Sequence, residues 1–158
     1  DIPTDADVRA SIVDNLLLQY EQEKLFDRNL DNYRKYAKLN HSGIADQLRP
    51  YICGSNKQID ARNLAIDIAE VCEVHELQEE LVNLVLDSSQ SIYLRESATK
   101  TLCSIGDAGT RLKLKPLAFS QLQEDQDDSL KSYILQALWS EHLTVEELFQ
   151  ALTPPKKL

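Results

Sequence analysis

The sequence has little of the material from which turns are made. Only four glycines and five prolines punctuate its 158 residues, which is too few for a sheet of many short strands. No stretch approaches the 18 consecutive apolar residues of a membrane span, and the start, Asp1-Ile-Pro-Thr-Asp, lacks the basic and apolar regions of a signal peptide. Methionine is absent even at position 1. We therefore expect an excised fragment of a larger protein, with no membrane partner.

Cysteines are also few. Cys53, Cys72 and Cys103 are odd in number, widely spaced and surrounded by apolar residues, a pattern that does not suit a disulfide framework. Reduced thiols in the core fit it better. The sequence therefore predicts a reducing, cytoplasmic setting, and it favours core packing over nucleophilic catalysis for these three residues.

Positive charge is in short supply. The chain has 17 basic residues against 26 acidic ones, for a formal net charge of −9. Residues 51–110 hold most of the excess, with 10 acidic and 4 basic residues. Such a surface is poorly suited to gripping a phosphate backbone, so we expect no nucleic-acid partner.

Apolar residues at helical spacing are abundant, and alternation typical of strands is nearly absent. The spacing predicts helices over residues 5–24, 28–38, 42–53, 58–73, 76–87, 91–105, 109–123, 127–140 and 144–152. Gly106 is predicted to be a C′ glycine, and Thr144 with Glu147 has the spacing of a capping box. Pro50 and Pro116 are expected to mark a kink or a shifted helix start.

Three segments repeat one pattern at intervals of 33 and then 36 residues. Each has a basic residue followed three positions later by an alanine or isoleucine: Arg62 and Ala65, Arg95 and Ala98, Lys131 and Ile134. A pair of short helices cannot bury its apolar stripe alone, whereas stacked pairs share one core. The predicted fold is therefore all-α, an α-solenoid of stacked antiparallel helix pairs. We expect the basic residues to form a ladder of ion pairs and caps, near acids such as Asp60, Asp67, Glu96 and Asp128.

The best-matching repeats are Tyr-Leu-Arg-Glu-Ser-Ala-Thr-Lys-Thr-Leu-Cys-Ser-Ile-Gly-Asp at 93–107 and Asp-Ala-Arg-Asn-Leu-Ala-Ile-Asp-Ile-Ala at 60–69. They resemble the short HEAT-like repeats of the phycobilisome-lyase type. The resemblance covers about residues 42–152 and implies a HEAT/armadillo-like superhelix, without implying a function. We expect one helical-repeat domain over 1–158, with an N-terminal helical pair at 1–40, HEAT-like pairs at 41–152 and a tail at 153–158.

The segment from Leu135 to Lys157 resembles the helical region that follows the nucleotide-binding module of bacterial NACHT-type signalling ATPases. That likeness implies a sensor or regulatory arm of a switch protein. No Gly-x-x-x-x-Gly-Lys-Ser/Thr loop occurs in the sequence, so an ATPase could belong only to the parent protein.

Two motifs resemble metal sites but lack an essential part. The sequence His75-Glu-Leu-Gln-Glu79 has a glutamate where a metalloprotease helix needs its second histidine, and His41 and His142 are remote in sequence. The acidic run 124–128 lacks the glycine and the twelve-residue spacing of an EF-hand loop. We interpret the first as acidic helix surface and the second as a loop that caps the next helix.

Two further clusters stay open on sequence alone. The basic residues Arg111, Lys113 and Lys115 could form an exposed face or a contact to an acidic partner. Aromatic residues concentrate in the N-terminal third and could be a capping core or a contact patch: Tyr20, Phe26, Tyr33, Tyr36 and Tyr51.

No catalytic, cofactor-binding or metal-binding residue is predicted, and no small-molecule substrate is inferred. The expected function is a non-catalytic protein-interaction or regulatory arm of a cytoplasmic signalling protein, whose partner is another protein or another domain of the same parent chain. The expected binding face is concave and consists of the solvent-directed residues of 58–73, 91–105 and 127–140. The alternatives are a bilin lyase-like HEAT protein and a HEAT-like nucleic-acid-binding protein such as a repair glycosylase. Exposed apolar surface is expected at both ends of the repeat array.

Overall fold

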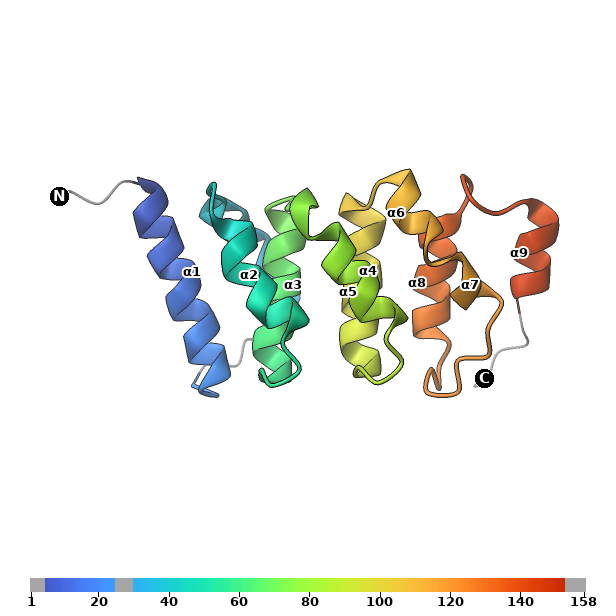
Figure 1. The fold of residues 1–158 in the computed structure, drawn as a ribbon, viewed down its shortest axis with the longest axis horizontal. Coiled ribbons are helices and arrows are strands. Elements are labelled where there is room, and N and C mark those ends of the chain that lie inside the picture. The colour runs from blue at the N-terminus through green and yellow to red at the C-terminus, as the bar shows by residue number, and fades with distance from the viewer. Residues whose placement is uncertain (1–4, 25–29, 153–158) are drawn as a thin grey trace. The chain divides into compact units, whose positions relative to one another are not determined.

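A computed structural model describes residues 5–24 and 30–152, and every regular element in those ranges is helical (Figure 1). In chain order the elements are α1 (Asp5–Glu21), the 3₁₀ helix η1 (Leu30–Leu39), α2 (Ile44–Cys53), α3 (Ile59–Val71), the 3₁₀ turn η2 (His75–Leu77), α4 (Gln78–Leu86), α5 (Ile92–Ile105), α6 (Ala108–Leu112), α7 (Lys115–Ala118), α8 (Ser129–Leu138) and α9 (Val145–Ala151). The predicted all-α class is confirmed. None of the described helices is both long and apolar enough to cross a membrane.

Most helix positions agree with the prediction, but two elements differ in kind. The segment expected as a helix at 28–38 is a 3₁₀ helix from Leu30 to Leu39, and the single helix expected at 109–123 is split into α6 and α7. Pro116 lies in the first turn of α7, where its missing N–H has no intrahelical acceptor to lose. It therefore marks a shifted helix start, as expected, whereas Pro50 lies inside α2.

Gly106, predicted to be a C′ glycine, is instead the C-cap residue of α5. Its φ is −68° and its ψ is 132°, so it ends α5 as an extended residue. A Cβ at this position would lie 2.4 Å from the carbonyl oxygen of Leu102. Close approach of the backbone, rather than a positive φ, is the reason that glycine fits here.

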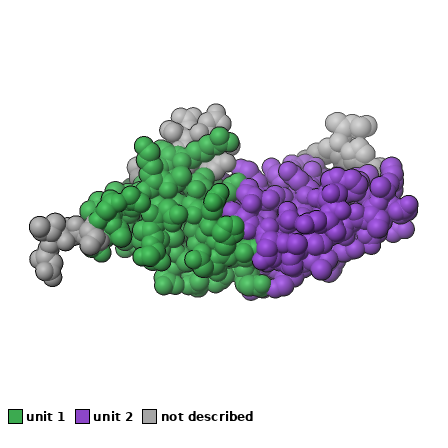
Figure 2. Space-filling view, turned by 90° about the horizontal axis from the view of Figure 1, so that it is seen from above, with its two compact units in different colours: residues 1–80 green, residues 81–158 purple. Residues whose placement is uncertain are grey.

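Contacts divide the chain into two compact units, residues 1–80 and residues 81–158 (Figure 2). In unit 1, α3 packs against α1, α2 and η1, and its side chains Ala65 and Ile66 are fully buried. In unit 2, α8 packs against α5 and α7, with Leu102 and Ile134 fully buried. The stacking of all pairs into one solenoid domain stays a prediction.

A buried arginine joins the two helices of a pair in each unit. Arg62, in the first turn of α3, donates from Nε to the carbonyl oxygen of Tyr51 at 3.1 Å and from Nη2 to that of Ile52 at 3.0 Å, both at the end of α2. Arg95, at the equivalent position of α5, donates from Nε to the carbonyl oxygen of Val85 at 2.8 Å, near the end of α4. Each arginine thus supplies donors to carbonyls that have no partner within their own helix.

The ion-pair partner of Arg95 differs from those expected from the sequence. Its Nη1 donates to Glu124, in the loop that precedes α8, rather than to the neighbouring acids named from the sequence. Arg95 is 1% exposed and Glu124 is 40% exposed. The arginine therefore contacts both the preceding helix and the next repeat from a buried position.

Arg95→Met should lower the free energy of unfolding by about 2–3 kcal/mol, because it leaves the Val85 carbonyl without its donor and removes buried packing. Lys100→Met, at an exposed position of the same helix, should change it by less than about 0.5 kcal/mol. Urea denaturation followed by circular dichroism measures both. Equal effects would contradict the structural role assigned to Arg95.

Candidate functional site

The exposed large apolar side chains of unit 2 include a stripe on α9. Val145 and Phe149, one turn apart on α9, are 54% and 70% exposed, and Leu152, the C-cap residue directly after α9, is 52% exposed. The spacing of four residues places Val145 and Phe149 on one helix face, and Leu152 follows at the next helical interval. Ala151 faces the core at 1% exposure. The helix is therefore apolar on two sides, of which one is covered; we call Val145, Phe149 and Leu152 the α9 stripe.

The start of α9 is fixed by the capping box predicted from the sequence. The Thr144 hydroxyl oxygen accepts from the backbone N–H of Glu147 at 3.1 Å, and a Glu147 carboxylate oxygen accepts from the backbone N–H of Thr144 at 3.0 Å. The Glu147 carboxylate also pairs with the Lys115 ammonium at 2.9 Å. These hydrogen bonds, chiefly the one from Lys115, lower the pKa of Glu147.

Two of the three residues of the basic cluster are engaged by acids of the same unit. The Arg111 guanidinium lies 2.8 Å from the Glu141 carboxylate, and Lys115 pairs with Glu147. They link α6 and α7 to the segment that carries α9. Arg111 and Lys115 therefore make ion pairs within the chain, and these pairs fix the segment that carries α9 against α6 and α7.

The exposed residues of α5 and α8 are few and mostly polar. On α5 the exposed residues Tyr93, Lys100 and Ser104 recur at helical spacing, and on α8 Ser132 and Gln136 do so. The two helices pack against each other in unit 2. Most other side chains of α3, α5 and α8 are buried or half-buried. The expected concave face over all three helices stays a prediction.

Trp139 follows directly after α8 and is 48% exposed. Tryptophan is enriched among the residues that dominate binding energies at protein interfaces.

The helices on both sides of Trp139 were predicted from the sequence, but the α9 stripe was not, although the spacing of Val145, Phe149 and Leu152 is visible in the sequence. The exposed face of a helix cannot be told from its buried face when both are apolar.

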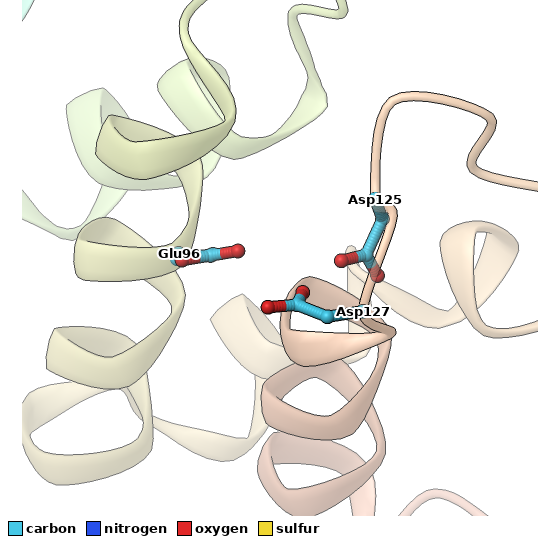
Figure 3. Close-up of side chains that lie close together, drawn as sticks. All are labelled: Glu96, Asp125 and Asp127. Carbon is cyan, nitrogen blue, oxygen red and sulfur yellow. The ribbon is translucent and has the colours of Figure 1, made fainter. Parts of the chain in front are cut away.

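Three carboxylates meet where α5 approaches the loop before α8. Oxygens of Glu96, Asp125 and Asp127 lie within 4.8 Å of one another, and Figure 3 shows the two aspartates facing the helix that carries Glu96. Among the described residues this is the one group of three possible protein ligands so close together. Burial, and then the charges of Asp127 and Asp125, raise the pKa of Glu96.

The aspartates of this cluster already have structural partners. Asp125 is fully buried, and its two carboxylate oxygens accept from the backbone N–H groups of Leu130 at 3.2 Å and Lys131 at 2.9 Å. Asp127 accepts from the N–H of Ser129 at 3.3 Å. The expected role of the acidic run as a cap of the next helix is confirmed, and the cluster needs no metal ion to explain it.

The cysteines differ in exposure. Cys72 is buried and its Sγ donates to the carbonyl oxygen of Tyr36 at 3.4 Å, whereas Cys53 is exposed and Cys103 is half-buried. Burial raises the pKa of Cys72 to about 11. Cys72 is therefore a core thiol, as predicted, while the prediction of a core position is wrong for Cys53 because it ends α2 at the surface.

The structure also locates most of the N-terminal aromatic residues and the His75–Glu79 motif. Tyr20 and Tyr36 are buried, so these two belong to the core, and the Lys57 ammonium lies 4.7 Å from the ring centre of Tyr51. Phe26 and the side chain of Tyr33 lie outside the described residues. His75 and Glu79 are exposed, consistent with an acidic helix surface.

Two glutamates occupy a backbone conformation that favours glycine. Glu73, after α3, has a φ of 52°, and Glu23, after α1, has a φ of 56°. In both places a six-residue hydrogen bond closes the helix end, from the N–H of Val74 to Ala69 at 2.9 Å and from that of Lys24 to Gln19 at 2.9 Å. These are Schellman-type ends in which glycine is the usual residue.

No protein-family model, curated protein or solved structure matches this chain. The likeness of the repeats to HEAT-like and NACHT-associated helices therefore stays a prediction.

Glu73→Gly should raise the free energy of unfolding by about 0.5–1 kcal/mol, since it removes the cost of a left-handed side-chain-bearing residue, offset in part by unfolded-state entropy. Glu23→Gly should act in the same direction. Glu76→Gly, within η2, should be destabilising by a similar amount because no positive φ is relieved there. Urea midpoints report all three, and a loss of stability in Glu73→Gly would contradict the assigned helix end.

Iodoacetamide at about pH 8 should alkylate Cys53 at least ~10-fold faster than Cys72, because burial hides the Cys72 thiol and disfavours its thiolate. Folding raises the pKa of the Cys72 thiol from 9.0 to about 11. The protonated thiol therefore stabilises the folded state relative to the thiolate below pH 9, and this stabilisation is lost as the pH rises toward 11. Peptide mass spectrometry after timed quenching gives both rates. Equal rates in the native protein would show that Cys72 is accessible.

Proposed function

We propose that this chain is a non-catalytic helical module that binds a protein partner, or another domain of its parent chain, through the α9 stripe of unit 2. The carrying observation is the 52–70% exposure of three large apolar side chains, two on one face of α9 and the third at its C-cap. Single exposed apolar residues are normal, whereas an apolar helix face without cover is typical of an interaction surface.

The shape of this surface selects the kind of partner. A helix face with residues at i, i+4 and i+7 packs against another helix or into a shallow apolar groove. Glu146 follows Val145 directly and is exposed beside the stripe. The carboxylate of Glu147, the next residue, forms an ion pair with Lys115. A partner helix with apolar residues at the same spacing and a basic flank complements it.

α9 is already folded and fixed in place before a partner binds, which supports its role as a binding surface. Its first turn is closed by the capping box, and the Arg111–Glu141 and Lys115–Glu147 pairs tie the surrounding segment to α6 and α7. A face held in place before binding loses less conformational entropy when a partner docks. The resemblance of residues 135–157 to a region of NACHT-type signalling ATPases supports a regulatory arm in a cytoplasmic signalling protein.

A photo-crosslinking amino acid at position 149 should trap a partner that the same group at position 112 does not trap. Leu112 is the matched control because it is a large apolar residue of unit 2, 45% exposed, on α6 rather than α9. The crosslinked protein or domain is identified by mass spectrometry and purified.

Titration calorimetry with that purified partner should then show that Phe149→Glu weakens binding by at least about tenfold, equivalent to about 1.4 kcal/mol. Leu112→Glu should leave the affinity within about twofold. Unchanged helicity and urea midpoints establish that both variants fold. Equal affinities for the two variants, or no crosslink specific to position 149, would overturn the proposed interface.

A further inference from the structure

An apolar side of α1 is exposed to solvent in unit 1. Val8 and Ile12, one turn apart, are 46% and 43% exposed, and Leu18, near the edge of the same side, is 46% exposed. Val13 and Leu17 on the opposite side are fully buried, where α2 and α3 pack against α1 (Figure 1). A helix that is apolar on both sides is normally covered on both sides. We call Val8, Ile12 and Leu18 the α1 face.

Acidic residues border the α1 face. Asp7 and Asp14 are exposed, and their spacing of seven residues places both along one edge of it. Arg9 is the one basic residue of α1. Its guanidinium is already engaged by the carboxylate of Asp5 and by the carbonyl oxygen of Asn40, the latter at 2.9 Å. The α1 face therefore combines apolar side chains with a border of net negative charge.

Ion pairs inside each unit show how this chain joins successive segments. Four of them connect a basic residue with an acidic residue 29–32 positions later, so in each the cation comes from the earlier segment. These pairs are Arg49–Glu80, Arg95–Glu124, Arg111–Glu141 and Lys115–Glu147. Arg9 follows the same direction when it donates to Asn40, 31 positions later. At these junctions the later segment therefore presents acceptors to cations of the segment before it.

The border of the α1 face has the chemistry of the acidic half of such a junction. Its matching half is a segment that brings lysine or arginine to Asp7 and Asp14, because opposite charges favour the right partner and like charges disfavour the wrong one. The α9 stripe of a second copy is a poor match, since the exposed Glu146 lies beside it. Charge therefore favours a basic helix as the occupant.

We propose that the α1 face binds an amphipathic helix of a protein partner, which places apolar side chains on Val8 and Ile12 and lysine or arginine beside Asp7 and Asp14. This surface goes beyond the α9 stripe, and its residues all lie in unit 1, so the two interfaces succeed or fail separately. The apolar contacts supply most of the affinity. The exposed ion pairs add little affinity and are weakened by salt, but they decide which helices are accepted.

The test uses three synthetic helical peptides as probes. They share leucines at i, i+4 and i+7 and differ only in the flanking residues, which are lysine, glutamine or glutamate. NMR titration of the full chain should give saturable shifts in the backbone amides of residues 7–19 with the lysine and glutamine peptides. The lysine peptide should bind at least about tenfold more tightly than the glutamate peptide at low salt. Shifts in residues 145–152 report the α9 stripe separately.

The apolar contribution is tested by a matched pair of variants. Ile12→Glu should weaken the binding of the lysine and glutamine peptides at least about tenfold. Ile59→Glu is the control because Ile59 is an apolar residue of the same unit, 47% exposed, at the start of α3. It should leave both affinities within about twofold. Unchanged urea midpoints establish that both variants fold.

The acidic border is tested by its effect on selectivity. Asp7→Asn with Asp14→Asn should reduce the preference for the lysine peptide over the glutamate peptide at least about fivefold. The same variant should leave the affinity for the glutamine peptide within about twofold. Asp60→Asn with Glu79→Gln, which removes two exposed acids elsewhere in unit 1, should leave the preference unchanged.

Sedimentation velocity of the chain alone tests the other occupant, a second copy. The proposal is overturned if Ile12→Glu abolishes a concentration-dependent dimer, because the α1 face then contacts another copy of the chain. It is also overturned if no peptide shifts residues 7–19, if the lysine and glutamate peptides bind equally, or if Ile59→Glu weakens binding as much as Ile12→Glu.

Discussion

The carbonyl oxygens at the end of a short helix need hydrogen-bond donors, and in this protein buried arginines supply them. Arg62 does so for α2 and Arg95 for α4, each from the first turn of the following helix. A guanidinium can serve several acceptors in one plane, so one side chain satisfies the helix end and joins two helices. Without it, closely packed short pairs would bury unsatisfied carbonyls at every junction. The same position in the third repeat, Lys131, is also buried.

Acidic residues solve the opposite problem at helix starts. Asp125 accepts from two amides at the start of α8, and Asp107 accepts from the N–H of Thr110 in the first turn of α6. These hydrogen bonds lower the pKa of Asp107, which means that the ionised cap is the form that the fold stabilises. Part of the acidic excess of the sequence is therefore structural. The carboxylate cluster at Glu96 follows from this capping loop.

Exposed apolar side chains and left-handed glutamates are the two features that work against stability. The α9 stripe leaves three large side chains in water, and Glu73 holds a conformation in which glycine is favoured. Glu23 shows the same conformation at the end of α1. The α9 stripe lies in unit 2 and both glutamates lie in unit 1, so each feature can be tested by substitution on its own.

The sequence by itself determined the helical class, the positions of most helices and several caps, because these depend on residues close together in the chain. Helical spacing predicted the positions of the elements, and the 33-residue offset predicted that Arg62 and Arg95 occupy equivalent positions. The spacing of Thr144 and Glu147 predicted the capping box. Tertiary structure alone decided which side of an apolar helix is covered, that Cys53 is exposed while Cys72 is buried, and that Arg95 pairs with Glu124. It also brought residues 40–42 against residues 72–76. The physical reason is that burial and partner choice depend on what distant segments place against a residue, which local periodicity does not encode.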